Sequence, residues 1–323
     1  MTATDSHTSA AQLAERIEQA LQRALIGQPQ VVREVLVALL SGGHILLEGV
    51  PGLGKTLLVR ALSQCLALQF RRIQFTPDLM PSDVTGHAMY DPKREQFHIR
   101  KGPAFSQLLL ADEINRASAK TQAALLEVMQ ERQITIEGKC FSLPPPFMVL
   151  ATQNPIDQEG TYPLPEAELD RFLLKSLIDY PDAADEAEIV QLVLSGAINE
   201  DLTVANMPVL ADADGLRGMQ QQVALITLDE AILDYALRLV RRTRDLRGLM
   251  RGAGPRASIA LCRAARANAL LCQRDFVIPD DIKRVAPAVL RHRIQLSADA
   301  EIDGQTPEKL LTALLDTEPA PRQ

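Results

Sequence analysis

The sequence predicts an α/β domain followed by an all-α domain, and three observations support this. Apolar runs of strand length alternate with helical patterns along the first part of the chain, as in a sheet whose strands are joined by helices. The run "LLLAD" at 108–112 is continuously apolar up to Asp112, which is typical of a strand covered on both faces. After "YPD" at 180–182, only helical patterns remain.

The elements of the α/β part follow from the spacing of apolar residues. Leu13, Ile17, Leu21 and Leu25 recur every four residues, which indicates an amphipathic helix. "VVREVLVALL", "TLLVRALSQCLAL" and "SAKTQAALLEVMQER" indicate three further helices. Strands are expected at 44–48, 70–76, 108–113, 147–154 and 171–180.

Two hairpins are predicted between these elements. "HAMYDPKREQFHIRKG" contains Asp91-Pro92 at its expected turn. "ITIEGKCFSL" is expected to turn at Gly138. Both would project from the sheet as insertions.

The helical part carries its own start signals. Thr227, with Glu230 three residues later, has the spacing of a capping box before an apolar helical pattern. Pro279 followed by two aspartates opens another helix. We therefore expect a disordered N-terminus at 1–10, an α/β domain at 11–181, a helical domain at 182–315 and a loose tail at 316–323.

Composition is that of an ordinary globular protein. Of 323 residues, 46% are hydrophobic and 23% are charged, and the net charge is −7. This acidic balance argues against a protein that binds nucleic acid backbones. No signal peptide and no run of about 18 apolar residues occurs, so we expect a cytoplasmic protein without a membrane span. The cysteines are Cys65, Cys140, Cys262 and Cys272, and none forms a C-x-x-C pair. Three of the four lie in apolar helical or strand patterns, so buried, reduced thiols are expected.

The stretch "GVPGLGKT" at 49–56 has the spacing of a phosphate-binding loop, or P-loop. Glycines let backbone amides turn inward around phosphate oxygens because no Cβ obstructs the approach. Lys55 would reach the β- and γ-phosphates, and the Thr56 hydroxyl would ligate Mg²⁺. The candidate nucleotide contacts in this segment are Gly49, Pro51, Gly52, Leu53, Gly54, Lys55, Thr56 and Leu57.

A P-loop needs acidic groups at a second strand end, and "LLLADE" supplies Asp112 and Glu113. Asp112 would complete the shell of Mg²⁺ ligands, and Glu113 would take a proton from the attacking water. An Asp-Glu pair can also mark the start of a helix, here of "INRASAK". The P-loop upstream favours the catalytic interpretation.

Three other polar residues each have two interpretations. Asn154 could orient a water molecule or be a turn residue after its strand. Arg171 could act in catalysis or pair with Asp170 or Glu168 at the surface. Arg256, in "GPRAS", could contact a ligand or merely face solvent at the start of a helix.

Together, "GVPGLGKT", "LLLADEINRA", "ATQNP", "LPEAELDRF" and "GPRAS" resemble the MoxR family of AAA+ ATPases in order and spacing. The resemblance covers most of the chain. It implies a P-loop NTPase fold of the AAA+ type, an αβα sandwich with a five-stranded parallel sheet of order 5-1-4-3-2, and a small all-α lid. It also implies ATP and Mg²⁺ as ligands and hydrolysis of ATP. The two hairpins resemble the helix-2 insert and the pre-sensor hairpin of this AAA+ branch.

The resemblance further implies roles for single residues. Asn154 matches the sensor-1 residue, Arg171 the arginine finger and Arg256 the sensor-2 arginine, whereas Arg116 matches no defined role. A finger completes the site of a neighbouring subunit, so a homo-oligomeric ring, usually a hexamer, is implied. Because a finger supplied in trans is worth about 10³–10⁵ in rate, an isolated subunit should be nearly inactive.

The implied function is that of a chaperone that uses ATP hydrolysis to remodel or activate a partner protein. Such partners often carry a von Willebrand factor A domain, or are metalloenzymes. The alternatives are a nucleic-acid motor, a metal-chelatase motor subunit, and a scaffold that binds ATP without turning it over. The intact Glu113, Asn154 and Arg171 argue against the scaffold. The basic residues of the inserts, which a nucleic-acid motor would use, are Lys93, Arg94, Arg100 and Lys139.

Overall fold

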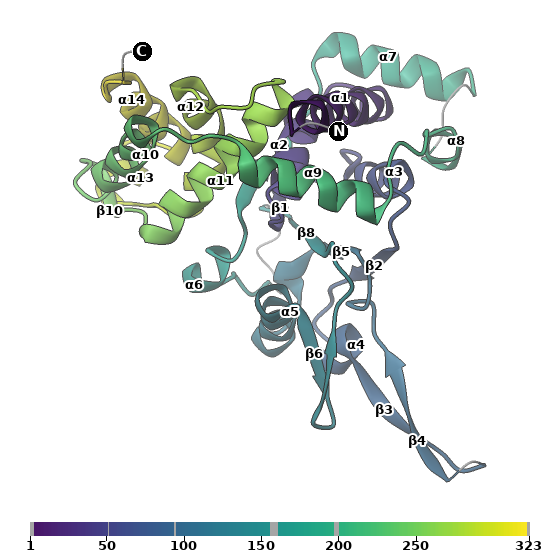
Figure 1. Cartoon of the computed structure of the whole chain (residues 1–323). Coiled ribbons are helices and arrows are strands. Elements are labelled where there is room, and N and C mark those ends of the chain that lie inside the picture. Colours follow the sequence, from purple (N-terminus) through teal and green to yellow (C-terminus); the bar gives the residue numbers. More distant parts are fainter. Residues whose placement is uncertain (1–2, 51, 94, 156–160, 197–199, 322–323) are drawn as a thin grey trace.

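A computed structural model of the chain describes residues 3–50, 52–93, 95–155, 161–196 and 200–321 (Figure 1). Its centre is a five-stranded parallel sheet, and counting the strands along the chain gives the expected order 5-1-4-3-2. The expected α/β fold is therefore confirmed. From one edge to the other, the strands are β2 (Phe70–Gln74), β5 (Leu108–Asp112), β8 (Met148–Gln153), β1 (Ile45–Glu48) and β9 (Leu174–Leu177).

The sheet is buried on both faces because its apolar side chains alternate between two cores. Ile45 and Leu47 of β1 belong to the larger core, whereas Leu46 belongs to the smaller one. The smaller core is closed by α5 (Ala119–Glu131), which contributes Leu125 and Met129. The larger core is covered by α1 (Ala3–Ala24), α2 (Pro29–Leu40) and α3 (Lys55–Cys65).

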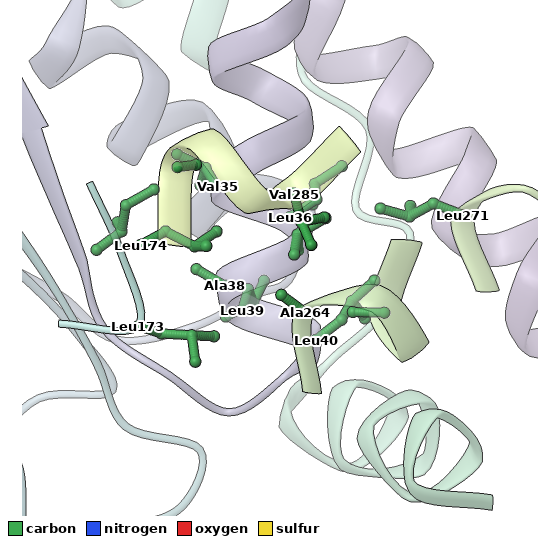
Figure 2. Packing of buried hydrophobic residues seen from close by; sticks show 14 of the residues in the cluster. Val35, Leu36, Ala38, Leu39, Leu40, Leu173, Leu174, Ala264, Leu271 and Val285 are labelled. Carbon is green, nitrogen blue, oxygen red and sulfur yellow. The ribbon is translucent and has the colours of Figure 1, made fainter. Parts of the chain in front are cut away.

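The larger core continues without a break into the helical part. Figure 2 shows Leu36 and Leu39 of α2 between Leu174 of β9 and the helices that carry Ala264 and Val285. The helices of this part are α7 (Ala183–Leu194), α8 (Glu200–Ala205), α9 (Ala213–Leu225), α10 (Glu230–Arg242), α11 (Pro255–Leu271), α12 (Pro279–Leu290), α13 (Ala298–Ile302) and α14 (Pro307–Thr317). No helix among the described residues is both long and apolar enough to cross a bilayer.

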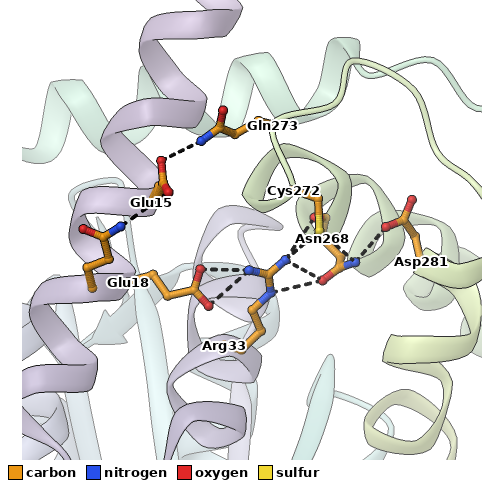
Figure 3. A network of polar contacts seen from close by, with 8 residues as sticks. Glu15, Glu18, Arg33, Asn268, Cys272, Gln273 and Asp281 are labelled. Atoms are coloured by element: carbon orange, nitrogen blue, oxygen red, sulfur yellow. Dashed lines mark hydrogen bonds and ion pairs between the residues drawn. The ribbon is translucent and has the colours of Figure 1, made fainter.

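A polar network also joins the two parts, as Figure 3 shows. Arg33 of α2 forms an ion pair with Glu18 of α1 at 2.8 Å and donates to the side-chain oxygen of Asn268 of α11. Asn268 in turn donates to Asp281 of α12 at 2.7 Å, and Arg274 forms an ion pair with that carboxylate. Each charge in this network is matched by a partner, so burial does not leave it uncompensated.

The two expected hairpins are present and extend away from the sheet (Figure 1). They consist of β3 (Gly86–Asp91) with β4 (Gln96–Lys101), and of β6 (Gln133–Ile136) with β7 (Lys139–Ser142). Glu137 and Gly138 both have positive φ, as a tight two-residue hairpin turn requires. A short helix, α4 (Pro81–Thr85), leads into β3, and α6 (Glu166–Leu169) precedes β9.

The prediction that the second part contains helices only is wrong. Two short strands, β10 (Leu249–Arg251) and β11 (Gln295–Leu296), pair there in antiparallel fashion. They join the segment before α11 to the segment after α12, a contact that no local pattern indicates. The predicted cap of α10 is also wrong, because Asp229 rather than Thr227 caps it, accepting from the Ala231 amide. The Thr227 backbone pairs instead with Asp275 and Val277.

The predicted loose ends are also corrected. Residues 3–10 lie within α1, whose Ala10 is buried in the larger core. At the other end, α14 continues to Thr317, and Glu318 accepts a hydrogen bond from Arg238 at 2.8 Å. Ala320 packs against the core. Residues 1–2 and 322–323, together with Pro51 and Arg94, lie outside the described residues.

The cysteines are only partly as expected. Cys65 is buried and Cys262 is half-buried, but Cys140 and Cys272 are exposed. Cys140 lies on the projecting β7, which has no core beside its outer face, and Cys272 caps the end of α11.

His44, directly before β1, generates a prediction about pH. Its Nδ1 accepts from the Val149 amide at 3.0 Å, and its Nε2 lies 3.1 Å from the Met129 carbonyl oxygen. Burial, reinforced by the charges of Arg132 and Arg263, lowers the pKa of His44 from 6.5 to about 4.

We expect the free energy of unfolding to decrease as the pH falls from 6.5 to about 4. In this window the unfolded imidazole binds a proton that the folded one does not, and the slope is up to about 1.4 kcal/mol per pH unit. The free energy of unfolding, measured with urea across this pH range, should depend less steeply on pH for His44→Gln than for the wild type. Parallel curves for the two proteins would contradict the assignment.

Candidate active site

The loop between β1 and α3 turns tightly and closes on itself. Gly52 and Gly54 have φ of +87° and +77°, a region that other residues adopt only under strain. A Cβ on Gly49 would lie 2.3 Å from the carbonyl oxygen of Ile178, so the loop passes directly against the backbone that follows β9. The Lys55 ammonium donates to the Gly49 carbonyl oxygen. No side chain that the structure describes caps the start of α3, and the first amides of a helix have no partner within it, as at anion sites on helix N-termini.

The two acidic residues at the end of β5 are fixed by a hydroxyl of the neighbouring strand. Thr152 of β8 is buried, and its hydroxyl donates to Asp112 Oδ1 at 2.5 Å. The Thr152 hydroxyl oxygen also accepts a hydrogen bond from the Glu113 amide at 2.8 Å. Glu113 itself adopts φ +54°, an unusual conformation for a residue with a side chain. One hydroxyl thus contacts both acidic residues, Asp112 through its carboxylate and Glu113 through its backbone amide.

Each carboxylate also has further partners. Those of Asp112 and Glu113 come from the edge strand β2, and Glu113 has one more from the 3₁₀ turn η1 (Ile114–Arg116). Arg72 of β2 forms an ion pair with Asp112 Oδ2 at 2.6 Å. Gln74 donates to Glu113 Oε2 at 2.8 Å, and Arg116 forms an ion pair with the same oxygen at 3.0 Å. In this state both acidic groups are neutralised or hydrogen-bonded.

These groups line one cavity of about 370 Å³, which we call the P-loop cavity. It brings together Lys55, Thr56, Asp112, Glu113 and Asn154, as expected from the sequence. Its described lining residues are Gly52, Gly54, Lys55, Thr56, Arg72, Gln74, Asp112, Glu113, Thr152 and Asn154. The sequence analysis missed Arg72, Gln74 and Thr152.

The remaining loop residues lie around this cavity rather than in its wall. Leu53 and Leu57 are half-buried against the larger core, where they support the loop and the start of α3. Pro51 lies outside the described residues. The only sequence signal for Thr152 is that it is a polar residue inside the otherwise apolar strand "FMVLAT".

The electrostatics of the cavity suit a phosphate and a divalent cation. Burial lowers the pKa of Lys55, while the carboxylates of Asp112, Glu113 and Glu48 act in the opposite direction. The Thr56 hydroxyl and the Asp112 carboxylate are hard oxygen ligands of the kind that Mg²⁺ takes. Among the described residues, no group of three or more His, Cys, Asp or Glu side chains could hold a metal. A cation here would therefore also need oxygen atoms from a bound nucleotide and from water.

The two expected arginines do not reach this cavity. Arg171 and Arg256 line a different cavity, of about 430 Å³, whose wall includes Gly43 at the start of β1. Because Gly49 follows the other end of β1, roughly 20 Å of extended chain separates it from Gly43. We call this second site the arginine cavity, after Arg132, Arg171, Arg256, Arg263 and Arg293. Within the described residues of one chain, neither expected arginine lines the P-loop cavity.

Known proteins share this architecture. Residues 44–174 match the ATPase family associated with various cellular activities (AAA), and residues 242–314 match the AAA lid domain. The chain is 45% identical to YeaC of Bacillus subtilis, over 94% of this chain and 93% of that protein. It is 44% identical to Chaperone MoxR1 of Mycobacterium tuberculosis, over 94% of this chain and 81% of that protein. The crystal structure of a candidate ATPase from Cytophaga hutchinsonii matches with a TM-score of 0.90 and 38% identity, covering 98% of each chain.

The tight approach at Gly49 generates a prediction. In Gly49→Ala the new Cβ would meet a backbone oxygen that cannot move freely, because the Ile178 amide is bonded to the Glu48 carbonyl at 2.7 Å. We expect the loop to shift and the affinity for ATP to fall at least tenfold, measured by fluorescence with a labelled nucleotide.

The matched control is Gly218→Ala in α9, where an added Cβ meets nothing within 4 Å. This change should leave the affinity unaltered and stabilise the helix by up to about 1 kcal/mol. Unchanged ATP affinity in Gly49→Ala would show that the loop is not the binding site.

Proposed function

Because the chain belongs to the MoxR family of AAA+ ATPases, we propose that it uses ATP hydrolysis to remodel or activate a partner protein, as a chaperone. The chain binds nucleotide and hydrolyses ATP, as its family does. The observation that carries the proposal is the separation of the P-loop cavity from the arginine cavity. A site divided in this way can be completed only by a second copy.

In the proposed reaction, the glycine amides and Lys55 bind the β- and γ-phosphates. Thr56 and Asp112 would hold Mg²⁺, which would neutralise charge on the phosphate oxygens. Glu113 accepts the proton of the attacking water, and Asn154 orients that water from the end of β8. Arg116 and Gln74 both hold Glu113 Oε2, so Glu113 acts as the base through Oε1 or after one of these partners moves away.

Arg171 and Arg256 are proposed to act on the nucleotide of a neighbouring copy. A phosphate site at one end of the sheet and a cationic site at the other are complementary surfaces on opposite sides of one molecule. Copies that join head to tail through such surfaces form a closed ring when the rotation allows it. We propose a hexamer, in which each arginine cavity covers the P-loop cavity of the next copy.

The partner protein is proposed to carry a von Willebrand factor A domain or to be a metalloenzyme. The relative named Chaperone MoxR1, whose similarity extends over both the α/β part and the helical part of this chain, supports the chaperone role. The choice of partner rests on the family resemblance.

Glu113→Gln should retain ATP but lose hydrolysis by at least about 100-fold, because the amide cannot accept a proton. Phosphate release and nucleotide retention after gel filtration measure the two effects. The control is Glu127→Gln, an exposed glutamate on α5, which should behave as the wild type. Turnover near the wild-type rate would show that Glu113 is not the base.

The same variant also serves to capture the partner. A ring locked with ATP should retain client proteins that Lys55→Ala does not, and mass spectrometry would identify them. Absence of any ATP-dependent enrichment would count against the remodelling function while leaving the ATPase assignment intact.

Arg171→Ala and Lys55→Ala should each be inactive alone, yet a mixture should regain part of the wild-type ATPase rate. In a mixed ring, the intact P-loop of an Arg171→Ala copy can be completed by the intact Arg171 of a neighbouring Lys55→Ala copy. The double variant Lys55→Ala/Arg171→Ala is the control and should rescue neither. Failure of every mixing ratio, with mixed rings verified by native mass spectrometry, would refute action in trans.

A further inference from the structure

The arginine cavity contains two arginines, Arg132 and Arg263, to which no role has been given above. Arg132 ends α5, and its Nη2 donates to the Gly42 carbonyl oxygen at 3.0 Å. Arg263 lies on α11 and donates to the Ser41 carbonyl oxygen. Each guanidinium has five N–H donors, and within the described part of the chain each makes one hydrogen bond. Most of their donor capacity therefore remains available.

The cavity has few counterions for its cations. Asp170 is the only carboxylate in its wall among the described residues, and it is shared by Arg293 at 2.7 Å and Arg256 at 3.8 Å. Neither Arg132 nor Arg263 has a carboxylate within ion-pair distance in the described ranges. Partial burial and the charge of Arg132 lower the pKa of Arg263, which indicates that the two cations repel each other.

Arg171 adds to this excess of positive charge. Its Nη1 donates to the Leu126 carbonyl oxygen at 2.8 Å. Its charge also acts on Glu168, whose pKa is raised by burial and, to a smaller extent, lowered by Arg171. An arrangement of this kind, with several guanidinium groups around one opening, matches a ligand with several anionic oxygens.

A structural explanation accounts for part of this geometry. Ser41 and Gly42 directly follow α2, and cations near a helix C-terminus are stabilising. One hydrogen bond from each arginine is sufficient for that purpose. It does not explain why both cations lie beside Arg171, Arg256 and Arg293 around one cavity.

We propose that Arg132 and Arg263 bind phosphate oxygens of the nucleotide held by the neighbouring copy, beside Arg171 and Arg256. This inference rests on the proposed ring, in which the arginine cavity of one copy faces the P-loop cavity of the next. The arginine cavity, of about 430 Å³, is lined by five arginines and one carboxylate among the described residues, which suits the negative charge of a triphosphate. Arginine is suited to this role because its planar fork binds two phosphate oxygens at once.

The test measures kcat/KM for ATP in Arg263→Ala and Arg132→Ala. Loss of one charge-assisted contact should lower it by about 10- to 100-fold in each variant. Mixing either variant with Lys55→Ala should restore part of the lost activity, since the lysine variant still supplies intact arginines to its neighbour. Arg241→Ala, which removes an exposed arginine of α10 outside the cavity, should retain the wild-type value.

A purely structural role is distinguished by where the defect acts. If the arginines only cap α2, the damage lies within the mutated copy, and mixing with Lys55→Ala would not restore its activity. If the alanine variants unfold at a lower denaturant concentration than the wild type, the same measurements are made on Arg263→Gln and Arg132→Gln. The glutamine amide can keep the hydrogen bond to Ser41 or Gly42.

The outcomes separate this inference from the proposed function. Rescue of Arg171→Ala without rescue of Arg263→Ala and Arg132→Ala would overturn the inference and leave the ring intact. Wild-type kcat/KM in both new variants would overturn it as well. Failure to rescue any of the three variants, in mixed rings shown to form, would overturn the inference together with the proposed function.

Discussion

The parallel direction of the five strands is the constraint on which the rest of the structure depends. It collects the P-loop, Asp112 and Asn154 at one end of the sheet, because each follows the carboxyl end of its strand. It places the residues before β1 and β9 at the other end, together with Arg171. The separation of the P-loop cavity from the arginine cavity is therefore a consequence of strand direction.

Within the P-loop cavity, the contact of Thr152 with both acidic residues sets the geometry. A hydroxyl can accept one hydrogen bond while donating another, and here it accepts from an amide and donates to Asp112. The acidic groups are thereby held in place before any ligand arrives, and Arg72 neutralises Asp112 in the meantime. Such preorganisation reduces the reorganisation that the reaction itself would otherwise require.

Much of the fold and of this cavity could be predicted from the sequence, because strand ends and the P-loop have local signals. The loop glycines, Lys55, Asp112 and Glu113 belong to short segments whose spacing is informative by itself. Thr152, Arg72 and Gln74 could not be predicted, because they act across neighbouring strands whose register is set by tertiary packing. The location of Arg256 likewise depends on how α11 docks against α2, which no local pattern encodes.

The buried pairing of Arg33 with Glu18 and Asn268 has a mechanical consequence. It lies across the junction that a hinge between the two parts would have to open, in a region also filled by Leu36, Leu39 and Val285. Exposing these side chains and breaking a buried ion pair would cost several kcal/mol. The chain is thus stiff across its own middle. In the proposed ring, movement driven by the nucleotide would therefore fall at the contacts between copies.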